Sequence, residues 1–179
     1  MGELLNLDLE QKAVGVREQL QAAVREHGRL VYSNSLGAEA MVLTDIIWTH
    51  VPEIDMFSID TGRLHQETYD LLERLERRYQ RPLRLVYPDS RALEQLVGSQ
   101  GINGFYHSLE ARLSCCHVRK VEPFKRAIEG YTAWVTGVRR EQSAARAQAQ
   151  PVEWDAEYGL YKVSPLLEWT EAEIWQYIR

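Results

Sequence analysis

Residues 30–50 read LVYSNSLGAEAMVLTDIIWTH, and this stretch decides the fold class. A short β-prone run leads into a polar turn at residues 33–37, and residues 38–50 form a mostly apolar segment of helical character. The same order of strand, turn and helix recurs at residues 54–79, and a third β-prone run follows at residues 83–87. Strands that alternate with helices of this length predict βαβ crossovers. We therefore expect an α/β fold with a parallel twisted sheet and helices on both faces.

Capping signals and apolar spacing predict further elements on either side of this core. Asp8 is expected to cap a first helix that ends at His27, and Thr170 and Glu173 have the spacing of a capping box that opens a last helix. The other expected elements are a helix at residues 90–97, a helical stretch between residues 104 and 128, a buried strand at residues 131–136 and a hairpin within residues 154–161.

The composition is that of a globular domain without a global positive charge. The chain has 179 residues, of which 45% are apolar and 26% are charged, and its formal net charge is −5. This length predicts one domain over residues 1–179, and the negative charge argues against non-specific nucleic-acid binding. The sequence has neither an apolar run near the roughly 20 residues of a membrane helix nor the features of a signal peptide. We therefore expect a cytoplasmic protein.

Two polar turns follow expected strands, where open parallel sheets bind their ligands. The turn from Ser33 to Glu39 offers hydroxyl groups, a glycine and the start of a helix, a combination that attracts anions. The alternative is a serine-rich turn that only caps the helix. The turn Asp60-Thr61-Gly62 places a carboxylate where a ribose or an adenine edge could bind, although such a turn is also common without a ligand.

Three arginines form a local positive patch in this acidic chain. Arg139, Arg140 and Arg146 lie within eight residues of one another, and guanidinium groups bind phosphate and sulfate oxygens in pairs. The alternative is a solvated arginine-rich loop. Together with the two turns, the patch predicts an anionic, nucleotide-like ligand.

The adjacent cysteines Cys115 and Cys116 are the most specific local feature. His117, Arg119 and Lys120 follow them, and cationic neighbours favour a thiolate that acts as a nucleophile or a metal ligand. The alternative is a pair of inert buried cysteines. Neighbouring cysteines cannot staple a secreted scaffold, and two thiolates cannot complete a zinc site or an iron–sulfur cluster. Because the chain has no other cysteine, further donors would have to come from elsewhere.

Four ordered motifs in residues 33–146 resemble the assimilatory adenylyl-sulfate and phosphoadenylyl-sulfate reductases. They read SNSLGAE at 33–39, DTGRLH at 60–65, CCHVRKVEP at 115–123 and TGVRREQS at 136–143. The resemblance implies a fold like the adenine nucleotide α-hydrolases, with a modified pyrophosphate loop. The substrate-binding residues that it implies are Ser33, Ser35, Gly37 and Glu39 for the phosphosulfate, Asp60, Thr61 and Gly62 near the adenosine, and Arg139, Arg140, Gln142, Ser143 and Arg146 in an arginine loop.

The resemblance also implies a cofactor and a catalytic residue. Cys115 and Cys116 would be two of the four ligands of a [4Fe–4S] cluster, and Lys120 would lie between cluster and substrate. The family's downstream Cys-x-x-Cys and its nucleophilic cysteine would lie beyond Arg179. The last expected helix stops there with Trp175 and Ile178 uncovered, which favours a missing C-terminal tail.

The implied activity is the reductive cleavage of adenosine 5′-phosphosulfate to sulfite and AMP in sulfate assimilation, with thioredoxin as the electron donor. The cysteine pair favours this substrate over its 3′-phosphorylated form. Two alternatives stay open, which are a phosphoadenylyl-sulfate reductase and a non-catalytic adenylate-binding module. An ATP pyrophosphatase is disfavoured because residues 33–39 depart from the Ser-Gly-Gly-x-Asp-Ser pattern. We expect neither nucleic acid nor membrane as a partner, and homo-oligomerisation is left open.

Overall fold

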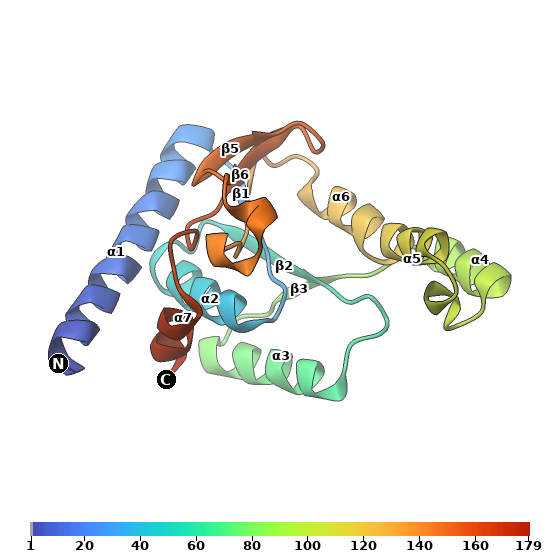
Figure 1. Ribbon diagram of the computed structural model, residues 1–179, viewed down its shortest axis with the longest axis horizontal. Coiled ribbons are helices and arrows are strands. Elements are labelled where there is room, and N and C mark those ends of the chain that lie inside the picture. The colour runs from blue at the N-terminus through green and yellow to red at the C-terminus, as the bar shows by residue number, and fades with distance from the viewer. Residues whose placement is uncertain (1) are drawn as a thin grey trace. The chain divides into compact units, whose positions relative to one another are not determined.

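A computed structural model describes residues 2–179 of the chain as an α/β protein (Figure 1). Six strands form a sheet in the order β3-β2-β1-β4-β6-β5, flanked by helices. Each strand pair whose register is resolved is parallel except β5 with β6, which is antiparallel. The expected α/β class with a parallel sheet is therefore confirmed. No helix in residues 2–179 is long and apolar enough to cross a membrane.

Two compact units make up the chain, and the expectation of one domain stays a prediction. The first unit joins Met1–Met56 to Gly130–Arg179, and the second is Phe57–Glu129. The helices and strands of the first unit are α1 (Gly2–His27), β1 (Leu30–Ser33), α2 (Ala38–His50), β4 (Ala133–Val135), β5 (Val152–Asp155), β6 (Leu160–Val163) and α7 (Glu171–Ile178). Those of the second are α3 (Gln66–Tyr79), β3 (Arg84–Val86), α4 (Ser90–Gln100), α5 (Leu109–Cys116) and α6 (Glu122–Ile128), while β2 (Asp55–Ile59) begins in one unit and ends in the other.

In the first unit, α2 packs its apolar residues into the core beside β1. Val42, Leu43, Ile46 and Ile47 are at most 1% exposed, which explains why this helix is apolar on nearly all sides. Figure 1 shows α7 beside α2, and the Tyr177 hydroxyl donates to Asp45 of α2 over 2.8 Å. The expected bounds of α2 and the capping box of α7 are both confirmed.

The second unit pairs β2 with β3 and continues through a run of helices. Phe57 and Ile59 of β2 are opposite Arg84 and Val86 of β3. The residues between α5 and α6, His117–Val121, form a π-helical turn. Such turns insert an extra residue into a helix and are frequent at functional sites. The expected helical stretch between residues 104 and 128 is therefore present but interrupted.

Two expected helix boundaries are wrong, and the strand expected at residues 131–136 is shorter, Ala133–Val135. Helix α1 begins at Gly2, so Asp8 lies inside the helix and does not cap it. Residues 3–8 contain neither Pro nor Gly, and nothing in them stops the helix from extending past a favourable capping residue. Helix α4 runs to Gln100, three residues beyond the expected end at Val97, because Gly98 is tolerated within it. Gly101, with φ +77°, ends the helix instead.

Candidate nucleotide site and cysteine cavity

The turn between β1 and α2 is held by the buried side chain of Asn34. Its Oδ1 accepts a 2.8 Å bond from the N–H of Leu36, and its Nδ2 donates to Thr44 Oγ1 over 2.8 Å. The bond to Leu36 supports a left-handed backbone, φ +58°, that leucine seldom adopts. Gly37 then caps α2 with its backbone, and Ser33 and Ser35 lie in the same turn. The sequence interpretation did not assign a role to Asn34.

Glu39 lies in the first turn of α2 and is bound to the arginine loop. Its Oε1 accepts 2.9 Å bonds from Arg139 Nε and Gln142 Nε2. Burial raises the pKa of Glu39, but bonds from its own backbone N–H, Arg139 and Gln142 outweigh burial and hold that pKa below its ordinary value. The carboxylate is therefore ionised at neutral pH.

Arg139 is a buried guanidinium that two carboxylates share. It is 5% exposed, and besides Glu39 it donates to Glu141 and, over 3.5 Å, to the carbonyl of Trp169. Burial lowers the pKa of Arg139, and the bonds to Glu39 and Glu141 outweigh that effect and raise it. Glu141 also accepts a 2.6 Å bond from the backbone N–H of Glu171, the first residue of α7. Arg139 thus connects α2, through Glu141, to α7.

The other arginines of this loop also contact the chain itself. Arg140 donates to Glu168 over 2.6 Å and to the carbonyls of Ala147 and Ala149 over 2.7 and 2.6 Å. Arg146 is exposed and donates to Gln142 Oε1. These bonds shape residues 140–149, while residues 141–148 are exposed, so the alternative of a solvated loop stays open. Ser143 is exposed and precedes the second 3-10 turn of the loop, Ala144–Arg146.

Gly137 lies in the motif TGVRREQS, although the sequence alone gave it no role. A Cβ atom at Gly137 would lie 3.1 Å from Glu39 Cβ and 3.9 Å from the Tyr32 hydroxyl. A side chain at Gly137 would therefore require Glu39 to shift by a few tenths of an ångström, so glycine suits this close approach of the backbone after β4 to the start of α2. Burial and the charge of Glu39 raise the pKa of Tyr32, which keeps this phenol neutral.

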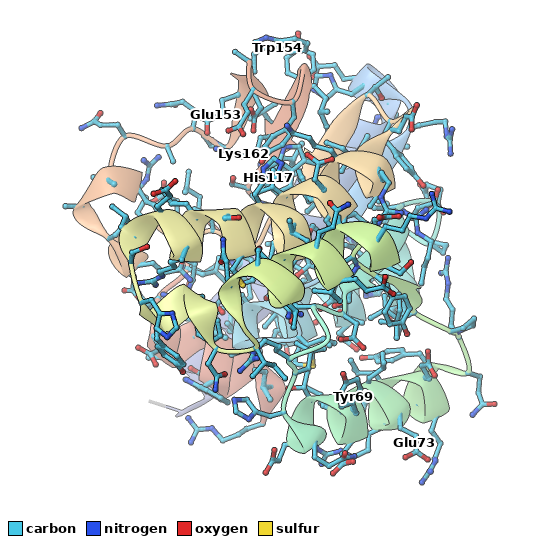
Figure 2. The ribbon with its side chains drawn as sticks, turned by 90° about the vertical axis from the view of Figure 1, so that its right-hand side faces the viewer. Tyr69, Glu73, His117, Glu153, Trp154 and Lys162 are labelled. Atoms are coloured by element: carbon cyan, nitrogen blue, oxygen red, sulfur yellow. The ribbon has the colours of Figure 1, made fainter. Side chains whose placement is uncertain are left out.

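In the second unit, Asp60 forms the turn that the sequence predicts after β2. Its Oδ1 accepts a 2.8 Å bond from the N–H of Gly62, whose φ is +71°. Both carboxylate oxygens also accept from the hydroxyl of Tyr69, at 3.1 and 3.0 Å. This bond, together with burial and the charge of Asp60, raises the pKa of Tyr69. Tyr69 belongs to α3 (Figure 2) and is another residue that the sequence interpretation missed.

Arg119 of the π-helical turn holds the same Asp-Thr-Gly segment from the other side. Its guanidinium donates to the carbonyl of Thr61 over 2.6 Å, and the residue is 7% exposed. Within residues 2–179 no carboxylate pairs with it, and its Nε is buried without a hydrogen-bond partner. The π-helical turn thus places a buried cation beside the turn of Asp60.

A cavity of about 840 Å³ in the second unit contains both cysteines. Four cationic side chains line it, and so do the rings of Phe105 and Tyr106. The complete lining is Thr61, Arg63, Phe105, Tyr106, Ser108, Leu109, Arg112, Cys115, Cys116, Arg119 and Lys120. Cys115 is half-buried and Cys116 is exposed, so the inert buried alternative does not hold for Cys116. The structure thus brings Lys120, Cys115, Cys116 and Thr61 to one cavity.

The residues of this cavity fit one half of an iron–sulfur site. Both thiols are free and accessible, and the surrounding cations suit an anionic cluster with thiolate ligands. A [4Fe–4S] cluster needs about four thiolates, and in the described part of the chain no three His, Cys, Asp or Glu side chains are placed to hold a metal ion. Two ligands can come from here, and the others would have to be supplied from outside these residues.

Comparisons with known sequences agree on one family. The model of the phosphoadenosine phosphosulfate reductase domain matches residues 29–179. A protein of Allochromatium vinosum named adenosine 5′-phosphosulfate reductase is 48% identical over 162 residues, which are 90% of this chain and 63% of the relative. One of the same name from Neisseria meningitidis serogroup B is 42% identical over 171 residues, 95% of this chain and 70% of the relative. The chain thus spans about three fifths of the length of the Allochromatium relative.

Solved structures support the same assignment. A phosphoadenylyl-sulfate reductase from Candida auris superimposes with a TM-score of 0.77 at 27% identity, covering 92% of this chain and 78% of that one. An NH3-dependent NAD synthetase from Campylobacter jejuni superimposes with a TM-score of 0.64 at 10% identity, covering 95% of this chain and 73% of that one. The second likeness concerns the fold alone, and together with the first it agrees with the expected adenine nucleotide α-hydrolase-like fold. From this match and these relatives, the chain belongs to the phosphoadenosine phosphosulfate reductase domain family.

Proposed function

We propose that this chain is the nucleotide-binding part of an adenosine 5′-phosphosulfate reductase. The observation that carries the proposal is the cavity in which Cys115 and Cys116 lie with Lys120 and three arginines. Relatives at 41–48% identity bear this name, which supports the choice of substrate. The proposal includes a role in sulfate assimilation and a cytoplasmic location.

The reaction is a thiol attack on the sulfur of the phosphosulfate. A cysteine thiolate outside residues 1–179 forms a bond to sulfur, the bond from sulfur to the bridging oxygen breaks, and AMP leaves with its electron pair. The product on the protein is a cysteine S-sulfonate. One thiol of thioredoxin then attacks the sulfur of this cysteine, which forms a mixed disulfide and releases sulfite. The second thiol of thioredoxin attacks this disulfide, which returns the cysteine thiolate and leaves thioredoxin as a disulfide. The two electrons that the dithiol loses are the two that the sulfonate sulfur gains when sulfite leaves.

The proposed binding residues of the two units differ in chemistry. In the first unit, Ser33, Ser35 and the backbone N–H groups that have no acceptor within the turn before α2 donate to the phosphosulfate, and Glu39, Arg139 and Gln142 keep the turn in shape. In the second unit, Asp60, Thr61 and Gly62 contact the adenosine, and the carboxylate of Asp60 accepts from a hydroxyl or amino group. Arg140, Ser143 and Arg146 order the arginine loop.

The cofactor of the proposal is a [4Fe–4S] cluster held by Cys115 and Cys116 together with two thiolates from elsewhere in the whole protein. When bound, the cluster would supply a fixed charge beside the substrate. Lys120 lines the same cavity, and its ammonium group would stabilise the negative charge of the phosphosulfate as AMP departs. Arg119 keeps the Thr61 segment in place.

A phosphoadenylyl-sulfate reductase is the second candidate. The match to the domain model of that name and the Candida auris structure favour it. The cysteine pair favours adenosine 5′-phosphosulfate, and the two substrates differ only by a 3′-phosphate. A direct comparison of the two substrates distinguishes the candidates.

The test measures sulfite release by the full-length protein with each substrate, under anaerobic conditions and with reduced thioredoxin. We expect adenosine 5′-phosphosulfate to be preferred by at least tenfold in kcat/KM. The variant Cys115→Ser should lose both the iron and the activity, whereas Ser114→Ala on the same helix should keep both. A protein that prefers the 3′-phosphorylated substrate, or that is active without iron, contradicts the first proposal.

A further inference from the structure

The turn before α2 has fewer free donors than an open helix N-terminus. The N–H of Leu36 donates to Asn34 Oδ1 over 2.8 Å, and the N–H of Gly37 donates to Ser35 Oγ over 3.4 Å. The N–H of Glu39 donates to its own carboxylate. Free N–H groups of this kind are what attract an anion to a helix N-terminus. Three of those in the turn already have acceptors within the chain.

Glu39 belongs to a group of charges that is negative overall. One guanidinium, Arg139, faces the two carboxylates of Glu39 and Glu141, so these three side chains carry a net charge of −1. Arg140 is paired with Glu168, and Arg146, which donates to the neutral amide of Gln142, adds one positive charge on the exposed side of the loop. The negative charge in the first turn of α2 is that of Glu39.

Glu39 cannot easily move away or become neutral. Its side chain is 21% exposed, and its partner Arg139 is 6% exposed, so this ion pair is shielded from water. Donors from Arg139, Gln142 and the backbone converge on the carboxylate. Gly137, whose added Cβ would lie 3.1 Å from Glu39 Cβ, closes the space on one side. The negative charge is thus fixed in the first turn of α2.

We propose that Glu39 is a specificity determinant, which makes the turn before α2 select a phosphosulfate of low charge and reject the pyrophosphate of ATP. The inference rests on the proposed function, because it concerns the same nucleotide site. At neutral pH, ATP carries about four negative charges, whereas AMP and adenosine 5′-phosphosulfate carry about two. A fixed carboxylate repels the more highly charged ligand more strongly. At about 6–8 Å and an intermediate dielectric, the extra charges change affinity by roughly tenfold or more.

The experiment measures binding of AMP, adenosine 5′-phosphosulfate and ATP to this chain by isothermal titration calorimetry in EDTA. We expect Glu39→Gln to raise the affinity for ATP by about tenfold and that for AMP by less than about threefold. Glu39→Asp keeps the charge and should keep the wild-type ratio of affinities. Glu18→Gln, an exposed position of α1, makes the same change of net charge and should leave all three affinities unchanged.

A second variant tests the charge without breaking the buried ion pair. Gln142 is exposed, and Gln142→Lys places a positive charge beside Glu39 while Arg139 stays in place. We expect it, too, to favour ATP over AMP by several-fold. Repeating the titrations with Mg²⁺ tests whether Glu39 repels ATP or binds it through a metal ion. A carboxylate that binds Mg²⁺ would make ATP bind better to the wild-type chain than to Glu39→Gln.

The outcomes distinguish this inference from the proposed function. If the wild-type chain binds neither AMP nor adenosine 5′-phosphosulfate, both the proposed function and the inference that rests on it are contradicted. If it binds both, and the two charge variants change the affinities for ATP and AMP by the same factor, only the inference is overturned. A wild-type chain that prefers ATP in EDTA overturns it as well.

Discussion

Arg139 in the first unit and Arg119 in the second are both nearly buried, yet they have opposite surroundings. Arg139 is paired with Glu39 and Glu141, whereas Arg119 donates to the carbonyl of Thr61 and has no carboxylate partner in residues 2–179. Removing a buried cation that two carboxylates share is strongly destabilising, because it leaves those carboxylates without a counter-charge. A buried cation without a counter-charge is costly for the fold and remains available to an anion. The two arginines therefore differ in whether a counter-charge is already present beside them.

The largest expected effect is on stability, at Arg139. Arg139→Met should lower the free energy of unfolding by about 3 kcal/mol, because it leaves the carboxylates of Glu39 and Glu141 without their shared partner. Urea denaturation at pH 7 measures this change. Arg140→Met, which removes a more exposed pair with Glu168, is the control and should cost less than about 1 kcal/mol. Equal losses of unfolding free energy in the two variants would show that the buried ion pairs of Arg139 matter no more than the exposed pair of Arg140.

Arg119 should show the reverse pattern. Arg119→Met should change the free energy of unfolding by less than about 1 kcal/mol, because it removes a buried charge that has no counter-charge. In the full-length protein the same variant should lower kcat for sulfite release by about tenfold, since a cation is lost from the cavity that contains Cys115. Denaturation and a steady-state assay on one preparation test both statements. A large loss of stability with unchanged kcat would assign Arg119 to the fold.

The stability of the fold should depend on pH through the carboxylate of Glu39. Because its folded-state pKa lies below the ordinary value, the unfolded chain binds more protons than the folded chain in the acidic range between those two values. The contribution of Glu39 is therefore complete above the unfolded pKa and is lost as the pH falls through the folded pKa. Urea midpoints measured from pH 7 into that range should fall less steeply for Glu39→Gln than for the wild type. Identical slopes would show that the carboxylate is not stabilised by Arg139.

The smallest expected effect is at Tyr69. Tyr69→Phe removes the hydroxyl that donates to both oxygens of Asp60, so the carboxylate keeps only the bond from Gly62. We expect a several-fold weaker affinity for AMP with little change in unfolding. Tyr79→Phe on the same helix is the matched control. If both variants bind AMP like the wild type, Asp60 does not depend on Tyr69 for its position.

The sequence was sufficient for the elements whose signals are local. The apolar run of α2, the turn at Asp60 and the capping box from Thr170 to Glu173 depend on residues at most a few positions apart, and all three are present. The start of α1 was wrong because a favourable capping residue does not by itself stop a helix. The π-helical turn after Cys116 leaves the apolar spacing too little changed to be foreseen.

The partners of the arginines could not be predicted in the same way. Arg139 and Glu39 are 100 residues apart, and nothing near either residue shows that they meet. In the sequence, Arg119 and Arg139 are equivalent positive charges. Only the fold determines that Arg139 pairs with carboxylates and that Arg119 does not. The roles of Asn34, Gly137 and Tyr69 likewise depend on distant or backbone geometry.

The division of the first unit between two segments of chain has a consequence for how the protein is made. Strand β1 pairs with β4, and α2 contacts α7, so residues 2–56 lack these partners until residues 130–179 have been synthesised. Phe57–Glu129, by contrast, is one continuous segment, and its part of β2 pairs with β3 within it. During synthesis we expect this segment to fold first, while the apolar residues of α2 stay uncovered. The apolar residues of α2 are therefore exposed to aggregation for longer than those of the second unit.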